Sequence, residues 1–289
     1  MTLLAVPNVS EGRDADRLRT FTDAIQASTL LLDVHSDPVH NRSVFTTTGS
    51  SSELVEAMAG LAVAATVIDL TGHTGVHPRL GVLDVCPIVP HSDPMTSAVV
   101  TAHEVGAAIA READLPVYFY GEAALRPEAL SLPGLRRGGL DGLIARAQHD
   151  LPPDVGPTDI DPRAGVVCVG ARGPLIAFNV YLECDGATAA QIAAAVRTAG
   201  GGPAGIRALG WGIGDPTRAQ VSMNLIDPDK TGIDDAFEVV VRAAAVQGVR
   251  IVATEIVGLV PERFMPDQDA EAARLLLKPG RSVEAALGR

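Results

Sequence analysis

The sequence predicts a mixed α/β (α+β) protein made of two tandem βαββαβ units, and three observations support this fold class. A length of 289 residues suits about two domains. Short apolar runs alternate with segments of helical periodicity in the first half, and the second half repeats that order. A proline-rich segment at 151–165 separates the halves. Each half is therefore expected to form a ferredoxin-like subdomain, a sheet covered by helices.

The elements of the first half follow from apolar runs and capping signals. Segment 3–9 is apolar and ends at a Pro-Asn pair, whereas segment 43–48 is rich in β-branched residues. Ser50 and Glu53 have capping-box spacing and precede apolar residues at one-face helical intervals. The polar segment 35–42 is expected to be a loop. We expect strands at 3–9, 30–34, 43–48, 82–89 and 116–121, and helices at about 14–27, from Ser50, and at about 94–113.

The second half has the same pattern of elements. We expect strands at 175–184, 206–213, 219–226 and 250–260, and helices at 187–199 and 233–248. Segment 151–165 holds four prolines and two glycines, which predicts an extended crossing segment. The predicted domains are residues 1–173, including this segment, and residues 174–289. A cleft between two such units is a natural ligand site, and we expect the functional site there.

Composition excludes several classes of function. The net charge of −12 argues against nucleic-acid binding. Lys230 and Lys278 are the only lysines, so a P-loop is absent and Schiff-base chemistry is disfavoured. Cys86, Cys168 and Cys184 include no CxxC pair and suit a reducing, cytoplasmic location. The chain shows no signal peptide at its start and no apolar stretch of ~20 residues, so we expect no membrane segment.

The segment GHTGVHPRLG, residues 72–81, is the strongest candidate for chemistry. His73 and His77 have the spacing of two metal ligands on a helix, but the glycines and proline around them disfavour a helix. A loop histidine can also be a plain surface residue. Pro78, however, restricts His77 to extended backbone, and Arg79 offers a planar fork for a carboxylate. An imidazole that titrates near ~6.5 beside such an arginine suits proton transfer on a small acidic substrate.

A second polar segment, HSDPVHNR at 35–42, leaves two interpretations open. It is either an Asp-Pro turn between antiparallel strands, or it also lines a site, because it carries more polar groups than a turn requires. A metal hydrolase that uses His35, His40, His73 and His77 is a further alternative. Gly210, which lies in a predicted strand pair, does not belong to a dinucleotide fingerprint.

Taken together, these motifs give the chain a family resemblance. It resembles the formiminotransferase domain of glutamate formiminotransferases over nearly its whole length. The matching segments, in the family's order, are VPNVSEGRD (6–14), LLDVHSDPVHNRSVF (31–45), GVHPRLGVLDVCPIVP (75–90), PVYFYGEAA (116–124), LIAFNV (175–180), AQVSMNL (219–225) and VGLVP (257–261).

The resemblance implies a one-carbon transferase of histidine degradation, with two α/β subdomains and a homodimeric assembly. Such an enzyme moves a formimino group between N-formimino-L-glutamate and N5 of tetrahydrofolate, giving 5-formiminotetrahydrofolate and L-glutamate. Tetrahydrofolate is then a co-substrate, and no metal is expected. The family's acid/base histidine corresponds to His77, and Arg79 to a residue that helps to hold substrate.

The resemblance and the second polar segment together supply the other expected site residues. For substrate they are Asn8, Asp33, His35, Asp37, His40, Asn41 and Arg42. For folate the resemblance implies two stretches: Gly156, Pro157, Thr158, Asp159, Ile160, Asp161, Pro162, Arg163, Ala164 and Gly165, and then Gly201, Gly202, Pro203, Ala204, Gly205, Ile206, Arg207, Ala208, Leu209 and Gly210.

Two departures from the family pattern affect the expected site. His35 and Val76 stand where animal members carry acidic residues, so Asp33 or Asp37 is the candidate to orient His77. The cyclodeaminase domain of bifunctional members is expected to be absent. The alternatives within this fold are another donor, such as formylglutamate, formiminoglycine or a pathway-specific substrate, and a non-catalytic folate or amino-acid sensor.

Overall fold

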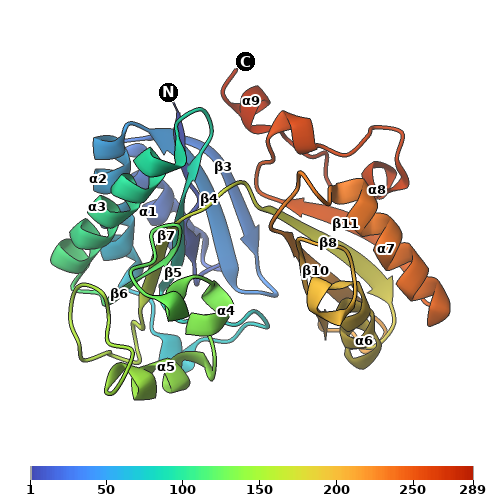
Figure 1. Ribbon diagram of the computed structural model, residues 1–289, viewed down its shortest axis with the longest axis horizontal. Coiled ribbons are helices and arrows are strands. Elements are labelled where there is room, and N and C mark those ends of the chain that lie inside the picture. Colours follow the sequence, from blue (N-terminus) through green and yellow to red (C-terminus); the bar gives the residue numbers. More distant parts are fainter. Residues whose placement is uncertain (1, 289) are drawn as a thin grey trace. The chain divides into compact units, whose positions relative to one another are not determined.

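The computed structural model describes residues 2–288, and the chain divides into two compact units, residues 1–172 and 173–289. Each unit has its own sheet and its own hydrophobic core (Figure 1). This confirms the expected class of two tandem α+β subdomains. No helix among the described residues has the length and apolar character needed to cross a membrane.

The sheet of the first unit has the spatial order β3-β4-(β1 and β2)-β5-β7-β6. Its strands are β1 (Leu3–Ala5), β2 (Asn8–Val9), β3 (Leu30–Asp37), β4 (Arg42–Gly49), β5 (Leu83–Pro90), β6 (Val117–Gly121) and β7 (Val167–Ala171). The strand expected at 3–9 is two short strands, both between β4 and β5, because Pro7 has no N–H to donate to the ladder.

Helices cover both faces of this sheet. Those of the first unit are α1 (Ala15–Gln26), α2 (Ser51–Ala65), α3 (Met95–Ala113), α4 (Leu132–Leu135) and α5 (Gly139–Ala147). The first three pack on one face through apolar residues such as Phe21, Met58 and Ile109. Leu135 of α4 and Leu143 of α5 pack on the other face, against β5, β6 and β7. Ser50 caps α2 in the capping box that the sequence predicts.

Two expectations for the first unit were wrong. Half of the polar segment 35–42 is strand: β3 continues to Asp37 and β4 starts at Arg42, and residues 38–41 form the turn between these antiparallel strands. Tertiary pairing with β4 overrides the polar composition there. Strand β7 was not predicted at all. It inserts in parallel between β5 and β6, a long-range pairing that local pattern does not report.

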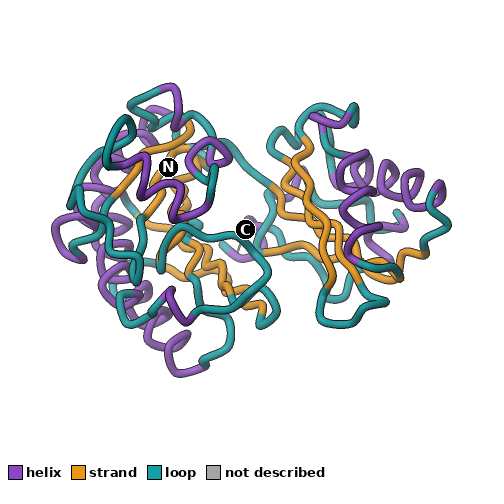
Figure 2. The backbone as a smooth tube through the Cα atoms, turned by 90° about the horizontal axis from the view of Figure 1, so that it is seen from below, coloured by secondary structure: helices purple, strands orange, loops and turns teal. Residues whose placement is uncertain are grey.

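The second unit has the simple ferredoxin-like order β11-β8-β10-β9, with all neighbours antiparallel. Its elements are β8 (Ile176–Glu183), α6 (Gly186–Val196), β9 (Ile206–Gly212), β10 (Ala219–Leu225), α7 (Ile233–Val246), β11 (Arg250–Val257), α8 (Glu271–Arg274) and α9 (Val283–Ala286). Figure 2 shows the longer helices of this unit on one face of its strands. The sequence predicts this order of strands and long helices.

Candidate functional site

The loop 73–82 lies between a 3-10 turn (Leu70–Gly72) and β5, and it packs against the turn that joins β3 to β4. Asn41 of that turn donates from Nδ2 to the Thr74 carbonyl at 3.1 Å. Asn41 adopts a left-handed backbone with φ of 48°, a conformation that asparagine tolerates better than most residues. A Cβ on Gly75 would lie 2.3 Å from the His40 carbonyl oxygen, so only glycine allows this close approach.

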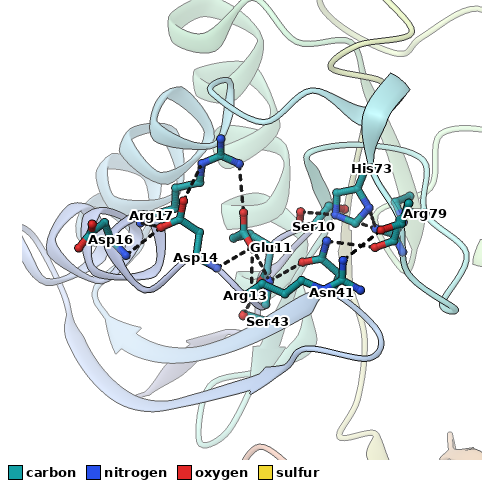
Figure 3. A network of polar contacts seen from close by, with 12 residues as sticks. Ser10, Glu11, Arg13, Asp14, Asp16, Arg17, Asn41, Ser43, His73 and Arg79 are labelled. Atoms are coloured by element: carbon teal, nitrogen blue, oxygen red, sulfur yellow. Dashed lines mark hydrogen bonds and ion pairs between the residues drawn. The ribbon is translucent and has the colours of Figure 1, made fainter. Parts of the chain in front are cut away.

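Arg79 joins the loop to the same turn. Its Nη2 donates to the carbonyl of His77 at 2.8 Å and to that of His40 at 3.2 Å. Its Nη1 contacts the ring of His73, whose Nε2 lies 2.8 Å from the carbonyl of Ser10 (Figure 3). Burial, followed by the positive charge of the neighbouring Arg42, lowers the pKa of Arg79 to about 10. The guanidinium expected to hold substrate thus stabilises the loop that carries His77.

The N-terminal motif 6–14 supports this loop from behind. Buried Glu11 accepts from the backbone N–H groups of Gly12, Arg13 and Asp14 at 2.9 to 3.0 Å. Burial opposes its ionisation, but these hydrogen bonds and Arg17 outweigh burial and lower the pKa of Glu11. Figure 3 shows Glu11 between Arg17 and Asn41. Gly12 donates its backbone N–H to Asn41 Oδ1, and the Ser10 carbonyl contacts His73, so the motif orders the segment next to His73.

His77 is half-buried, and its Nδ1 lies 2.7 Å from the carbonyl oxygen of Pro78. A carbonyl can only accept, so Nδ1 carries the proton and Nε2 is the basic nitrogen of the neutral ring. The pKa of His77 lies well below its ordinary value, first because the ring is desolvated and then because Arg42 and Arg136 are positively charged. The ring is therefore neutral near pH 7.

Arg42 and Arg136, the two positively charged residues near His77, both contact Asp84, which is fully buried. Leu83 pairs with Val9 and Val85 with Asn8, so Asp84 is the extra residue of a β-bulge, a feature that re-aims side chains. Its carboxylate accepts from Arg42 Nη1 at 2.6 Å, from Leu80 N at 2.7 Å and from Arg136 Nη2. Burial disfavours the charge, but the two arginines outweigh it and lower the pKa of Asp84 to about 2.

Sequence reasoning missed both Asp84 and Arg136. Arg136 directly follows α4, in an LRRGG stretch that matches no motif considered, and it is 52 positions from its partner. The available signal was a charged residue inside the apolar strand VLDVCPIV, since a buried carboxylate requires a cationic partner. Asn8, by contrast, was expected, and its Oδ1 accepts from Arg42 Nε at 3.1 Å.

Asp37 forms hydrogen bonds with His40, the third residue after it. Its Oδ2 lies 2.5 Å from His40 Nδ1, and its Oδ1 accepts from the backbone of Val39 and His40. Burial opposes ionisation, yet the His40 hydrogen bonds and charge keep the pKa of Asp37 below its usual value. The His40 ring is 6.1 Å from the His77 ring, centroid to centroid. Asp33 and His35 lie further back on β3, opposite Thr46 and Val44.

The first expected folate stretch, 156–165, lies along the base of the His77 loop. The backbone of Leu70 donates to the Arg163 carbonyl, that of Val82 to Ala164, and that of Val166 to Leu80, each at 2.9 Å. Pro157, Asp159, Asp161 and Arg163 line a cavity of about 400 Å³ together with residues 66, 68 and 113–116. The stretch 156–165 is thus next to the His77 loop, within the same unit.

The second expected stretch, 201–210, belongs to the other unit and is described by itself. It comprises the turn after α6 and most of β9. Gly201 and Gly205 have left-handed backbones with φ of 94° and 85°. A Cβ on Gly210 would lie 2.2 Å from the Ala189 carbonyl oxygen, so glycine is needed there for α6 to pack closely on β9. Among residues 2–288, no group of three or more metal-ligating side chains is arranged to hold a metal ion.

Comparison with known proteins gives matches along nearly the whole chain. A family model described as the formiminotransferase domain, N-terminal subdomain, matches residues 2–172, and one described as the formiminotransferase domain matches residues 177–275. A glutamate formimidoyltransferase of Thermoplasma acidophilum is 41% identical over 91% of this chain and 89% of its own. One of Streptococcus pyogenes serotype M1 is 39% identical, over 91% and 90%. A formimidoyltransferase-cyclodeaminase of Sus scrofa is 37% identical, with 92% of this chain matching 51% of that protein.

Proposed function

This chain belongs to the formiminotransferase family, and from that premise we propose that it transfers a formimino group from N-formimino-L-glutamate to N5 of tetrahydrofolate. The products are 5-formiminotetrahydrofolate and L-glutamate, and His77 is the general acid/base. The observation that carries the role of His77 is the 2.7 Å contact between its Nδ1 and the Pro78 carbonyl oxygen, which assigns the proton to Nδ1 and makes Nε2 the basic nitrogen.

The reaction requires one proton to leave and another to arrive. N5 attacks the formimino carbon, a tetrahedral intermediate forms, and the new N5–C bond is completed as N5 loses its proton to His77 Nε2. The bond between the carbon and the glutamate nitrogen then breaks, and His77 returns the proton to the departing amine. Because the low pKa of His77 keeps its ring neutral at the outset, the base form is ready for the first step.

Several observations support a folate co-substrate and a donor near this loop. The stretch 156–165 borders the base of the loop and a cavity, as a pterin or benzoyl group would need. The Asp37–His40 pair and Arg42 supply polar groups beside His77. Direct substrate contacts by Arg79, Asn8, Asp33, His35 and Asn41 stay predictions. So do folate binding by 201–210, a cytoplasmic location, a homodimer, and a reaction without a metal.

The test is a transfer assay with a matched pair of histidine variants. Purified protein is mixed with N-formimino-L-glutamate and tetrahydrofolate, and formation of the folate product is followed by absorbance. His77→Ala should lower kcat by about 10²–10⁴-fold, since that is the usual contribution of general acid/base catalysis, while folate affinity stays similar. His149→Ala removes an exposed histidine after α5 and should have no effect. Unchanged kcat in the His77 variant would refute its role.

A donor panel separates the remaining candidates. Formiminoglutamate, formiminoglycine and formylglutamate are each offered with the same folate, and the preferred donor is the one with the highest kcat/KM. Transfer only from another donor would replace the proposed substrate. Tight folate binding without transfer from any donor would instead identify a sensor.

A further inference from the structure

The anionic donor in the proposed reaction requires a cation that Arg79 does not readily supply. A carboxylate bound beside a half-buried histidine loses water and is best compensated by a guanidinium. Arg79 already donates to the carbonyls of His40 and His77 and contacts His73. Turning it toward a ligand would break the bonds that hold the His77 loop.

Arg136 has the donors that Arg79 lacks. A guanidinium offers five N–H groups, and the only side-chain hydrogen bond from Arg136 to a described residue runs from Nη2 to Asp84. Its Nε is buried and has no acceptor among the residues that the structure describes. Leaving a buried charged donor unsatisfied is costly, so an acceptor supplied by a ligand would be favourable here. The Arg136 side chain keeps 22% exposure, so a ligand can reach it.

The local charge also favours an anion. One carboxylate, Asp84, faces two guanidinium groups, Arg42 and Arg136, so this cluster has one positive charge in excess. Arg42 is more committed than Arg136, because its Nε donates to Asn8 and its Nη1 to Asp84, and its side chain is only 11% exposed. Arg136 is thus the more available of the two cations.

The cluster lies beside the reacting position. Asp84 accepts from the backbone N–H of Leu80, three residues after His77, and this ties the cluster to the end of the His77 loop. The charges of Arg42 and Arg136 both act on the His77 ring. In formiminoglutamate the α-carboxylate is attached to the carbon that bears the reacting nitrogen, whereas the γ-carboxylate is at the far end of the side chain. A cation close to His77 therefore matches the α-carboxylate.

We propose that Arg136 binds the α-carboxylate of the formimino donor through its unfilled donors, with Arg42 as a second, more buried cation. This deepens the proposed function, on which it rests, and gives the Arg42–Asp84–Arg136 cluster a purpose. Asp84 holds the two like-charged side chains together. The substrate carboxylate then neutralises the remaining positive charge.

Steady-state kinetics with two Arg136 variants test this assignment. Arg136→Gln removes the charge, and Arg136→Lys keeps the ion pair with Asp84 but loses the planar fork. We expect KM for the donor to rise about 100-fold in the first and about 10-fold in the second, with KM for tetrahydrofolate nearly unchanged. Arg137→Ala is the matched control, because Arg137 is the adjacent arginine and is exposed. A donor KM that stays at the wild-type value in both variants, with thermal melting confirming that they fold, would overturn the proposal.

Donor analogues identify the carboxylate. Converting the α-carboxylate of the donor to a carboxamide should raise the donor KM of the wild-type enzyme. The same change should leave the donor KM of Arg136→Gln almost unaltered, since that variant has already lost the interaction. If the γ-carboxamide, and not the α-carboxamide, raises the donor KM of the wild-type enzyme but not that of Arg136→Gln, the assignment is overturned.

A binding measurement separates this inference from the transfer reaction itself. Calorimetric titration of the wild-type protein, Arg136→Gln and Arg137→Ala with L-glutamate needs no turnover. Weaker binding in the Arg136 variant alone supports the inference even if transfer activity is not found, which would overturn only the proposed reaction. Glutamate binding that is absent in the wild-type protein, or equal in all three proteins, overturns the role of Arg136.

Discussion

At the scale of single residues, the chemistry of the candidate site depends on the surroundings of one imidazole. His77 donates from Nδ1 to its neighbour's carbonyl, and its ring lies near Arg42, Arg136 and Asp84, with the His40 ring 6.1 Å away. Desolvation and the two arginines lower its pKa, and Asp84 opposes them. Since the pKa of Asp84 is about 2 and that of Asp37 is also lowered, both carboxylates are ionised near pH 7.

The sign of this shift gives a pH prediction. A lowered pKa keeps His77 neutral, and so competent as a base, at pH values below ~6.5, the ordinary midpoint for histidine. Nuclear magnetic resonance titration of the His77 ring, identified by its loss in His77→Ala, should give a midpoint below that value. Arg136→Gln removes a positive neighbour and should move the midpoint upward, and so should bound L-glutamate in the wild-type protein. A midpoint at or above ~6.5 in the free wild-type protein would contradict the described electrostatics.

At the scale of elements, a bulge and a glycine position the site. The β5 bulge turns Asp84 toward Arg42 and Arg136, and Gly75 lets the His77 loop approach the β3–β4 turn closely. The loop is thus held by close backbone packing as well as by the hydrogen bonds of Arg79.

A pair of glycine variants, one in the His77 loop and one directly before it, tests the role of this packing. In Gly75→Ala the new Cβ would be 2.3 Å from the His40 carbonyl oxygen and 2.6 Å from Arg79 Nη2, so the loop must shift. We expect kcat to fall by about 10- to 100-fold, because a displacement of about 1 Å can cost that much. Gly72→Ala has no atom within 4 Å of its new Cβ and should keep the wild-type kcat. Equal kcat values in the two variants would show that the close approach is unimportant for turnover.

At the scale of the whole molecule, the residues expected to take part in one reaction are divided between two units, each with its own hydrophobic core. The core around α1, α2 and α3 lies within residues 1–172, and the core around α6 and α7 within residues 173–289. His77 and the stretch 156–165 belong to the first unit, whereas the stretch 201–210 belongs to the second.

This division predicts the behaviour of the separated halves. Residues 173–289 contain a complete βαββαβ unit with its own core and should melt cooperatively when produced alone. Neither half alone should transfer a formimino group, because each lacks one of the expected folate stretches. Circular dichroism on heating and the transfer assay check both statements. Full activity in residues 1–172 alone would show that the second unit is not needed for folate.

Local sequence patterns were enough to predict most elements and the central loop. The capping box at Ser50 and Glu53 is encoded within four residues, and its energetics are local. The stiffness that Pro78 gives to the segment around His77 is likewise a property of neighbouring residues. This is why the long helices and most strands were predicted without coordinates, why the loop around His77 could be proposed, and why the family resemblance was clear from contiguous motifs.

Only the tertiary structure revealed which distant groups meet. The pairing of Asp84 with Arg136 spans 52 positions, and strand β7 reaches its place between β5 and β6 by a long connection. Charge interactions and strand pairing depend on distance in space, and several chain paths satisfy the same local patterns. The sequence therefore determined most of the elements and the candidate loop, whereas the folded chain decided which charges surround His77.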